Sequence, residues 1–329
     1  METVLLNNTA TNLFDETLIQ EVESTVRPFI QANTTESSLE EIKSSHVIPV
    51  FIKDNEPVIS HGDFIESAIE VVSDIYPSET ILRPSIRLSH PVKGRIPEAK
   101  DKPAKDLLEH EKTLYFERMA FIVEIPSITD EIDYQKLSLT IGGVKSYHLD
   151  NLYSKKGADE HFKVFIGFKN SVCTNLCVAT DGYLNDLKVK NIGQLKASIR
   201  TLIEGYNANY HLHSLRRLNE YSLTENQFAH LIGRCRMFSH LPGDYKEEIH
   251  PLLLSDTQLS TVVKDYYRDK SFCKDDNGNI NLWRLYNLFT GANKSSYIDT
   301  FVDRSVNSFH FVEELKMVLD QKTTSWYLN

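Results

Sequence analysis

The middle of the chain has the alternating pattern of a β-sheet. Between about residues 117 and 180, segments rich in strand-forming residues follow one another, and apolar and polar residues alternate at 136–141. Gly142 and Gly143 indicate a bulge or kink, and Lys169-Asn170 indicates a two-residue hairpin turn. Strands are predicted at residues 118–125, 136–141, 144–149, 161–168 and 171–179. This succession of hairpins predicts an antiparallel sheet.

The last part of the chain has a helical pattern instead. After residue 191, apolar residues recur every three or four positions. Capping boxes at Thr224-x-x-Gln227 and Ser255-x-x-Gln258 each begin a helix, and Asn281 caps another that ends at Gly291. Further helices are expected at residues 192–206, 295–305 and 309–321. The fold class is therefore α+β: a central antiparallel sheet of hairpins followed by a mainly helical C-terminal half.

The beginning of the chain has weaker signals. Residues 1–45 are rich in Asn, Thr, Ser and Glu, and 33–38 has the composition of a linker. One short amphipathic helix is predicted from apolar residues at helical spacing, namely Leu13, Phe14, Leu18, Ile19 and Val22. We therefore expect residues 1–45 to be an acidic, loosely ordered arm, with order beginning near His46. Residues 46–190 would form the strand-rich part, with a strand at 47–52 and a helix at 63–76, and 191–329 would pack on it.

The net charge of −10 is unevenly distributed. Residues 1–82 contain three basic and 15 acidic residues, so they carry −12 and the remainder carries +2. The acidity is thus an argument against nucleic-acid binding only for the N-terminal part. There is no run of 18 apolar residues and no secretory signal pattern, so we expect a cytoplasmic protein that does not enter a membrane. The four cysteines lack the spacing of a zinc site, and neither a metal nor a cofactor is expected.

A basic, proline-punctuated segment lies at residues 83–112. It is expected to contain one strand at 85–89 and otherwise to be an extended loop, with acidic residues diluting its charge. Its candidate phosphate contacts are Lys93, Arg95, Lys100 and Lys102.

Two other groups of polar and aromatic residues have alternative interpretations. Asn170, Thr174, Asn175, Tyr286 and Asn287 either satisfy local turns in the interior or line a polar groove. Residues 283–304 interleave aromatic and basic side chains, which suits base stacking and phosphate contacts as well as ordinary core packing. The candidates from this second group are Arg284, Lys294, Tyr297 and Arg304.

Three sequence blocks carry a resemblance to a known family. They are SHPVKGRIPEA at residues 89–99, FIGFKNSVCTNLC at 165–177 and WRLYNLFTGANKSSY at 283–297. From about residue 45 to the end, the chain resembles an uncharacterised family of unknown function from Bacteroides and relatives, often found on conjugative or integrated mobile elements. A remoter similarity is to the broad phage/plasmid-like family. The resemblance implies a cytoplasmic accessory protein of mobile DNA, and it supplies no catalytic residue.

Three hypotheses about function follow. The first is a non-enzymatic mobile-element accessory protein associated with nucleic acid, for single-strand binding or annealing, with single-stranded DNA as partner and oligomerisation as an option. The second is a protein-interaction or counter-defence factor that uses the acidic N-terminal arm to bind a host protein. The third is an enzyme of unrecognised type, which requires a deep pocket containing groups with strongly shifted pKa values.

Overall fold

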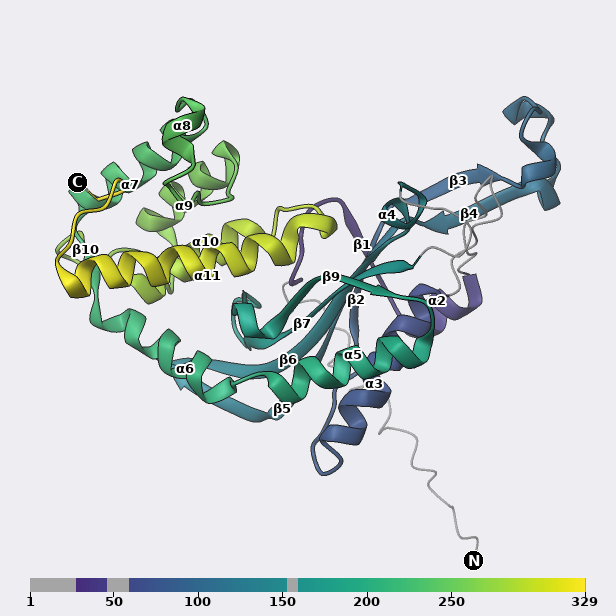
Figure 1. Cartoon of the computed structure of the whole chain (residues 1–329), viewed down its shortest axis with the longest axis horizontal. Coiled ribbons are helices and arrows are strands. Elements are labelled where there is room, and N and C mark those ends of the chain that lie inside the picture. The colour runs from purple at the N-terminus through teal and green to yellow at the C-terminus, as the bar shows by residue number, and fades with distance from the viewer. Residues whose placement is uncertain (1–27, 46–58, 153–158, 329) are drawn as a thin grey trace, which may run out of the picture.

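The computed structural model describes residues 28–45, 59–152 and 159–328 (Figure 1). The strands are β1 (Thr34–Ser37), β2 (Ser85–Ser89), β3 (Pro91–Arg95), β4 (Lys112–Phe116), β5 (Arg118–Ile132), β6 (Gln135–Ser146), β7 (Glu160–Asn170), β8 (Leu176–Cys177), β9 (Tyr183–Val189), β10 (Ser222–Leu223) and β11 (Ile280–Asn281). The helices are α2 (Leu39–Ser45), α3 (His61–Ile75), α4 (Tyr147–Leu152), α5 (Ile192–Gly205), α6 (Ala208–Arg217), α7 (Glu225–Phe238), α8 (Gly243–Lys246), α9 (Asp256–Arg268), α10 (Leu282–Asn293) and α11 (Ile298–Gln321).

The main sheet is antiparallel throughout. Its strands follow the order β1-β2-β5-β6-β7-β8, and β9 pairs with the first part of β7. The long strands β5 and β6 are joined by a two-residue turn in which Asp133 and Tyr134 have φ angles of 49° and 60°. Positive φ at both central positions gives the backbone twist that hairpin strands require. With helices filling the C-terminal half, the α+β class is confirmed.

One face of the sheet is apolar and is covered by α3 and α5, which lie side by side beneath it in Figure 1. Phe121, Ile141 and Val164 project from β5, β6 and β7 into this layer, where Phe64 of α3 packs edge-on against Phe121. The same core continues into the C-terminal helices, so the sheet and the helical half share it.

The second face is covered by the start of α11 and by residues 28–30. Ile122, Val144 and Phe165 meet Phe301 and Val302 there. This layer also contains charged groups. Lys163 of β7 donates to the Asp299 carbonyl at 2.7 Å and to the Asp303 carboxylate at 2.5 Å, so polar contacts hold α11 to the sheet as well as apolar ones.

The helical half is built around α10, most of whose side chains are buried. It packs between α9 and α11, and the short β10–β11 pair closes the loop that leads into it. Phe228 of α7 and Tyr266 of α9 stack with their ring centroids 4.1 Å apart. Among the described residues, no helix is long and apolar enough to cross a membrane.

Several sequence predictions within the sheet are wrong. Strand β6 runs in continuous register through Gly142 and Gly143, and the irregularity lies in β5 between Ile125 and Thr129. The glycines are needed for space, because a Cβ on Gly143 would lie 2.3 Å from the Phe64 ring. Residues 147–149 begin helix α4 and do not continue the strand. Residues 171–175 form a longer turn, which leaves only β8 as a strand.

The predicted helix boundaries are partly right. The capping boxes at Thr224 and Ser255 and the Asn281 cap all begin helices as expected. Gly291 lies inside α10, which continues to Asn293, and the two helices expected at 295–305 and 309–321 are the single helix α11.

The expectation of disorder up to His46 is wrong for residues 28–45. Strand β1 pairs with β2 at the edge of the sheet, where a linker was expected. Phe29 and Ile30 are buried against α11, and this apolar burial holds the segment in place. Residues 1–27 and the strand expected at 47–52 lie outside the described residues.

Gly143→Ala should destabilise the fold, because the new methyl group would overlap the Phe64 ring in a filled core. We expect a loss of about 1–3 kcal/mol in the free energy of unfolding, measured by urea denaturation. Gly205→Ala at the end of α5 is the control, since nothing lies within 4 Å of its Cβ position. Equal urea midpoints for the two variants would contradict the packing account.

Candidate functional site

A two-stranded arm projects from the body of the molecule, formed by β3, β4 and the short 3₁₀ turns between them (Figure 1). Its strands pair from Pro91 opposite Phe116 to Arg95 opposite Lys112. The sequence predicted an extended loop here and missed the hairpin. Because an isolated hairpin is marginally stable in water, the arm needs an anchor at its base.

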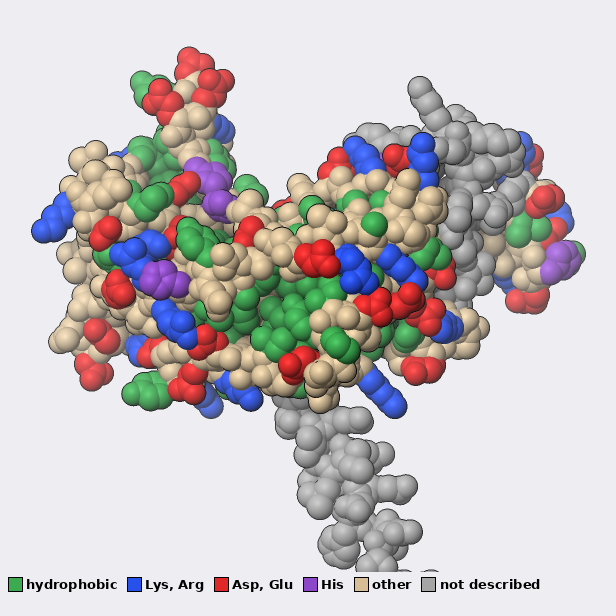
Figure 2. Space-filling model, turned by 60° about the horizontal axis from the view of Figure 1, so that its bottom comes forward, with side chains coloured by type: hydrophobic (Ala, Val, Ile, Leu, Met, Phe, Trp, Pro, Cys, Tyr) green, Lys and Arg blue, Asp and Glu red, His purple; other side chains and the backbone are tan. Residues whose placement is uncertain are grey.

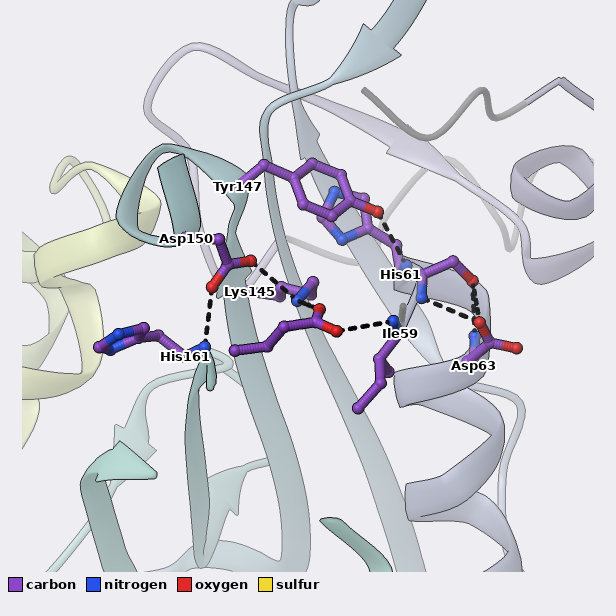
Figure 3. A network of polar contacts seen from close by, with 9 residues as sticks. Ile59, His61, Asp63, Lys145, Tyr147, Asp150 and His161 are labelled. Atoms are coloured by element: carbon purple, nitrogen blue, oxygen red, sulfur yellow. Dashed lines mark hydrogen bonds and ion pairs between the residues drawn. The ribbon is translucent and has the colours of Figure 1, made fainter. Parts of the chain in front are cut away.

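A buried ion cluster lies next to that base (Figure 3). The Lys145 side chain is fully buried and donates to Glu160 Oε2 at 2.7 Å and to Asp150 Oδ2 at 3.1 Å. The remaining carboxylate oxygens accept backbone hydrogen bonds from Ile59 at 3.0 Å and His161 at 2.8 Å. Lys145 Nζ also lies 4.0 Å from the centre of the Phe162 ring.

This cluster is connected directly to the arm. His61 stacks on Tyr147, with ring centroids 4.3 Å apart, and its Nε2 hydrogen bonds to the Phe116 carbonyl at 2.7 Å. The Tyr147 amide donates to the Glu117 carbonyl at 3.0 Å. Burial raises the pKa of the Tyr147 hydroxyl, which keeps it neutral. The contacts therefore fix the point where the arm's return strand enters β5.

The charged groups of the ion cluster bind one another. Lys145 pairs with both carboxylates, and the remaining carboxylate oxygens accept backbone hydrogen bonds. The adjacent cavity beside His161 holds about 20 Å³, which is room for about one water molecule. These contacts give the cluster a structural role.

A groove opens where the arm meets α11. It holds about 210 Å³ and is lined by Ser89, His90, Glu117, Arg118 and Tyr297, together with residues 32–34 and Ile298. Tyr297 is 69% exposed and stands at the N-cap of α11. Arg118 pairs with Asp299 and lies 3.8 Å from Glu117, so its charge is neutralised within the fold. The open groups of the groove are thus chiefly the Tyr297 and His90 rings.

A second hollow of about 210 Å³ lies on the second face of the sheet, the face that α11 covers in part. Arg87 binds the Thr34 carbonyl at 2.9 Å there, and Lys169 pairs with Glu124. Burial lowers the pKa of the Arg87 guanidinium. Arg83 is exposed at the rim, and Thr174 also borders the hollow.

The predicted phosphate contacts on the arm differ in their exposure and in their bonds to other groups of the arm. Lys93 and Lys100 are exposed, whereas Arg95 is half-buried and donates to the carbonyls of Lys100 and Lys102. Lys102 forms an ion pair with Glu111. Residues 91–116 contain six basic and five acidic residues, so the arm as a whole is nearly neutral. Figure 2 likewise shows basic and acidic side chains interspersed over the face that it displays.

Three of the other proposed nucleic-acid contacts make internal bonds. Arg284 donates to the Cys273 carbonyl at 3.2 Å. Lys294 is buried and donates to Thr174 Oγ1 at 2.8 Å. Arg304 donates to Gln258 Oε1 at 3.0 Å, and burial lowers the pKa of its guanidinium. Of this group, only Tyr297 is open to a ligand.

The candidate polar-groove residues lie in the interior. Asn170, Thr174, Asn175, Tyr286 and Asn287 are all buried. Asn175 Nδ2 donates to the Asn287 carbonyl at 3.0 Å, and Asn170 Oδ1 accepts from the Val172 amide at 2.9 Å. The first bond attaches the turn at residues 171–175 to α10, and the second holds the turn itself. Of the five residues, Thr174 borders one of the hollows described above. The two bonds fit the interpretation in which buried amides satisfy local structure.

Sequence reasoning missed His90, Arg118 and Lys145. His90 and Arg118 are brought together by the hairpin, because His90 precedes its first strand and Arg118 follows its second, so both flank its base. Lys145 did have a signal: a lysine close to the end of an apolar strand, if it is buried, needs partners of opposite charge.

The sequence was compared with known families and proteins. A family described as a domain of unknown function, from a B. theta gene description (DUF3871), matches residues 13–328. The chain belongs to this DUF3871 family. This confirms the expected uncharacterised Bacteroides family, while the mobile-element setting and the phage/plasmid-like similarity stay predictions. No curated protein and no solved structure matches the DUF3871 chain.

Two ionisable groups in the core of the DUF3871 chain have strongly shifted pKa values. Burial lowers the pKa of His211 to about 3 and raises the pKa of the Cys177 thiol. Neither residue borders the hollows described above. Within the described ranges, no cluster of three or more His, Cys, Asp or Glu side chains could hold a metal ion. The enzyme hypothesis stays a prediction.

Lys145→Met should destabilise the fold strongly, because it leaves two carboxylates buried without their cation. We expect a loss of about 3–5 kcal/mol in the free energy of unfolding, measured by urea denaturation. Lys43→Met is the matched control, since the Lys43–Glu66 pair is exposed and such pairs contribute about 0–1 kcal/mol. A small loss at Lys145 would refute its anchoring role.

His211 should make stability depend on pH in the acid range. Its pKa is about 3 in the fold and about 6.5 in the unfolded chain, so below pH 6.5 only the unfolded chain gains a proton. Stability should therefore fall with pH below 6.5, by about 2 kcal/mol at pH 5 from this group. His211→Gln should reduce the change in urea midpoint between pH 7 and 5. His213→Gln, exposed on the same helix, should leave that change intact.

Proposed function

We propose that this DUF3871 chain binds single-stranded nucleic acid in the groove between the arm and α11, as a non-enzymatic accessory protein. The observation that supports the proposal most directly is the position of Tyr297. Although more than 200 residues separate them in the sequence, Tyr297 and His90 border the same groove, and Lys93 follows on the arm.

The exposed rings favour a single strand over a duplex. Bases stack on aromatic side chains only where they are unpaired, and each stacked base contributes about 1–3 kcal/mol. Tyr297 offers most of its ring to solvent at the start of a long helix. The N-terminal end of such a helix also favours a nearby anionic group.

Phosphate contacts would contribute less than stacking. Lys93, Lys100 and Lys105 are exposed on the arm, and within the described part of the chain they have no ion-pair partner. Acidic residues between them keep the local potential low. With three or four cations involved, log Kd should change with log salt by a slope of about 2–3. This shallow dependence is expected of a binder that relies on stacking.

The protein-interaction hypothesis depends on the acidic arm at residues 1–45, of which residues 1–27 lie outside the described residues. A host-protein partner, a mobile-element role and oligomerisation all remain predictions.

Tyr297→Ala should weaken single-strand binding about 5- to 150-fold, the loss of one stacked base. The measurement is fluorescence anisotropy of a labelled thymine oligonucleotide at low and moderate salt, with a duplex of equal length for comparison. Tyr210→Ala is the control, because Tyr210 is 65% exposed on α6 and lies outside the groove.

Charge reversal on the arm provides a second variant. Lys93→Glu combined with Lys100→Glu should weaken binding and reduce the salt slope. No binding by the wild-type protein at low salt would overturn the proposal. So would equal losses for Tyr297→Ala and Tyr210→Ala.

A further inference from the structure

The arm has a hollow of its own, separate from the groove at its base. It holds about 480 Å³, and Lys93, Gly94, Arg95 and residues 112–114 line one side. Ala104, Leu107 and Glu109 line the other. In the hairpin, Lys93 pairs with Leu114 and Arg95 with Lys112, so these four side chains share one face. We call this region the arm hollow.

The arm hollow combines apolar and cationic groups. Ala104, Leu107 and Leu114 supply the apolar surface, and Leu114 is 41% exposed. Three cations, Lys93, Arg95 and Lys112, stand around it, while Glu109 pairs with Lys112. Leu108, which is 54% exposed, adds to the apolar surface of the same turn region. Such a surface suits a ligand with an apolar side flanked by carboxylates.

We propose that the arm hollow binds the acidic, apolar segment at residues 13–23 of this same protein. The segment carries Asp15, Glu16, Glu21 and Glu23, and the first basic residue of the chain is Arg27. Its charge is therefore −4. The segment lies outside the described residues, and its sequence is what supports the match.

The apolar residues of the segment have a spacing that fits a groove. Phe14, Leu18 and Val22 recur every four positions, which places them on one face if the segment is helical. Amphipathic helices bind apolar grooves through anchors at this spacing. The carboxylates beside those anchors would then meet the lysines and arginine of the arm hollow.

The segment also has an advantage over other ligands of similar chemistry. It is part of every copy of the protein, so it is present at the same concentration as the arm hollow. Nucleic acid would satisfy the cations but would leave Leu107 and Leu114 without an apolar partner. The inference does not depend on nucleic-acid binding.

The test uses the full-length protein without nucleic acid. Carbodiimide treatment joins carboxylates to amines in direct contact, and peptide mass spectrometry identifies the pairs. We expect bonds from Asp15, Glu16, Glu21 or Glu23 to Lys93 or Lys112. Mixing isotope-labelled with unlabelled protein tells whether the two groups belong to one chain or to two, and either result supports the proposal.

A labelled peptide of residues 11–26 gives the matching affinity measurement. Leu114→Ser should weaken its binding to the full-length protein at least fivefold, while Leu253→Ser, at a similarly exposed leucine elsewhere, should not. The urea midpoint of each variant checks that the fold is retained. Cross-links confined to other lysines, or equal peptide affinity for wild type and Leu114→Ser, would overturn the proposal.

Discussion

The fold depends on one buried cation. Lys145 lies at the end of β6, where the sheet, α3, α4 and the base of the arm all meet, and it neutralises carboxylates from two of these elements. A buried ion pair contributes little net free energy compared with apolar packing, but removing one partner is costly. Its importance is therefore in specifying geometry. If Asp150 and Glu160 must both reach one ammonium group, the ends of β6 and β7 cannot slip in register.

This constraint has consequences on both faces of the sheet. On the apolar face it fixes the start of α3, because the Ile59 amide binds Glu160. At the edge it fixes the arm, because His61 binds the last carbonyl of β4. The second face is then free to carry charge, and Lys163, Lys169 and Arg87 pair there with acidic or carbonyl groups. The sheet thus separates an apolar core from a second layer that combines apolar packing with paired charges.

Local signals in the sequence predicted local structure well. Thr224, Ser255 and Asn281 mark helix starts because a cap is decided by residues within one turn. The break expected between residues 305 and 309 is absent from α11. At that point Asn307 donates to the Pro251 carbonyl and Ser308 to the Arg304 carbonyl, so both polar side chains are satisfied within the continuous helix. Strand β1 and the arm were missed because their pairing partners are not visible in a short window. Tyr297 could be named as a candidate, but its nearness to His90 depends on the packing of α11 against the sheet.

Helix α11 gives the molecule a rigid connection between its two halves. Twenty-four residues of helix measure about 36 Å, and this one carries Tyr297 at its start and reaches the far end of the helical bundle. A tyrosine on a loop could turn toward a ligand by itself. Here the backbone next to Tyr297 is held by the hydrogen bond from Lys163 of the sheet to the Asp299 carbonyl, so it can tilt only together with helix α11. A ligand that moved Tyr297 by tilting α11 would therefore also have to move the contacts of α11 with α10.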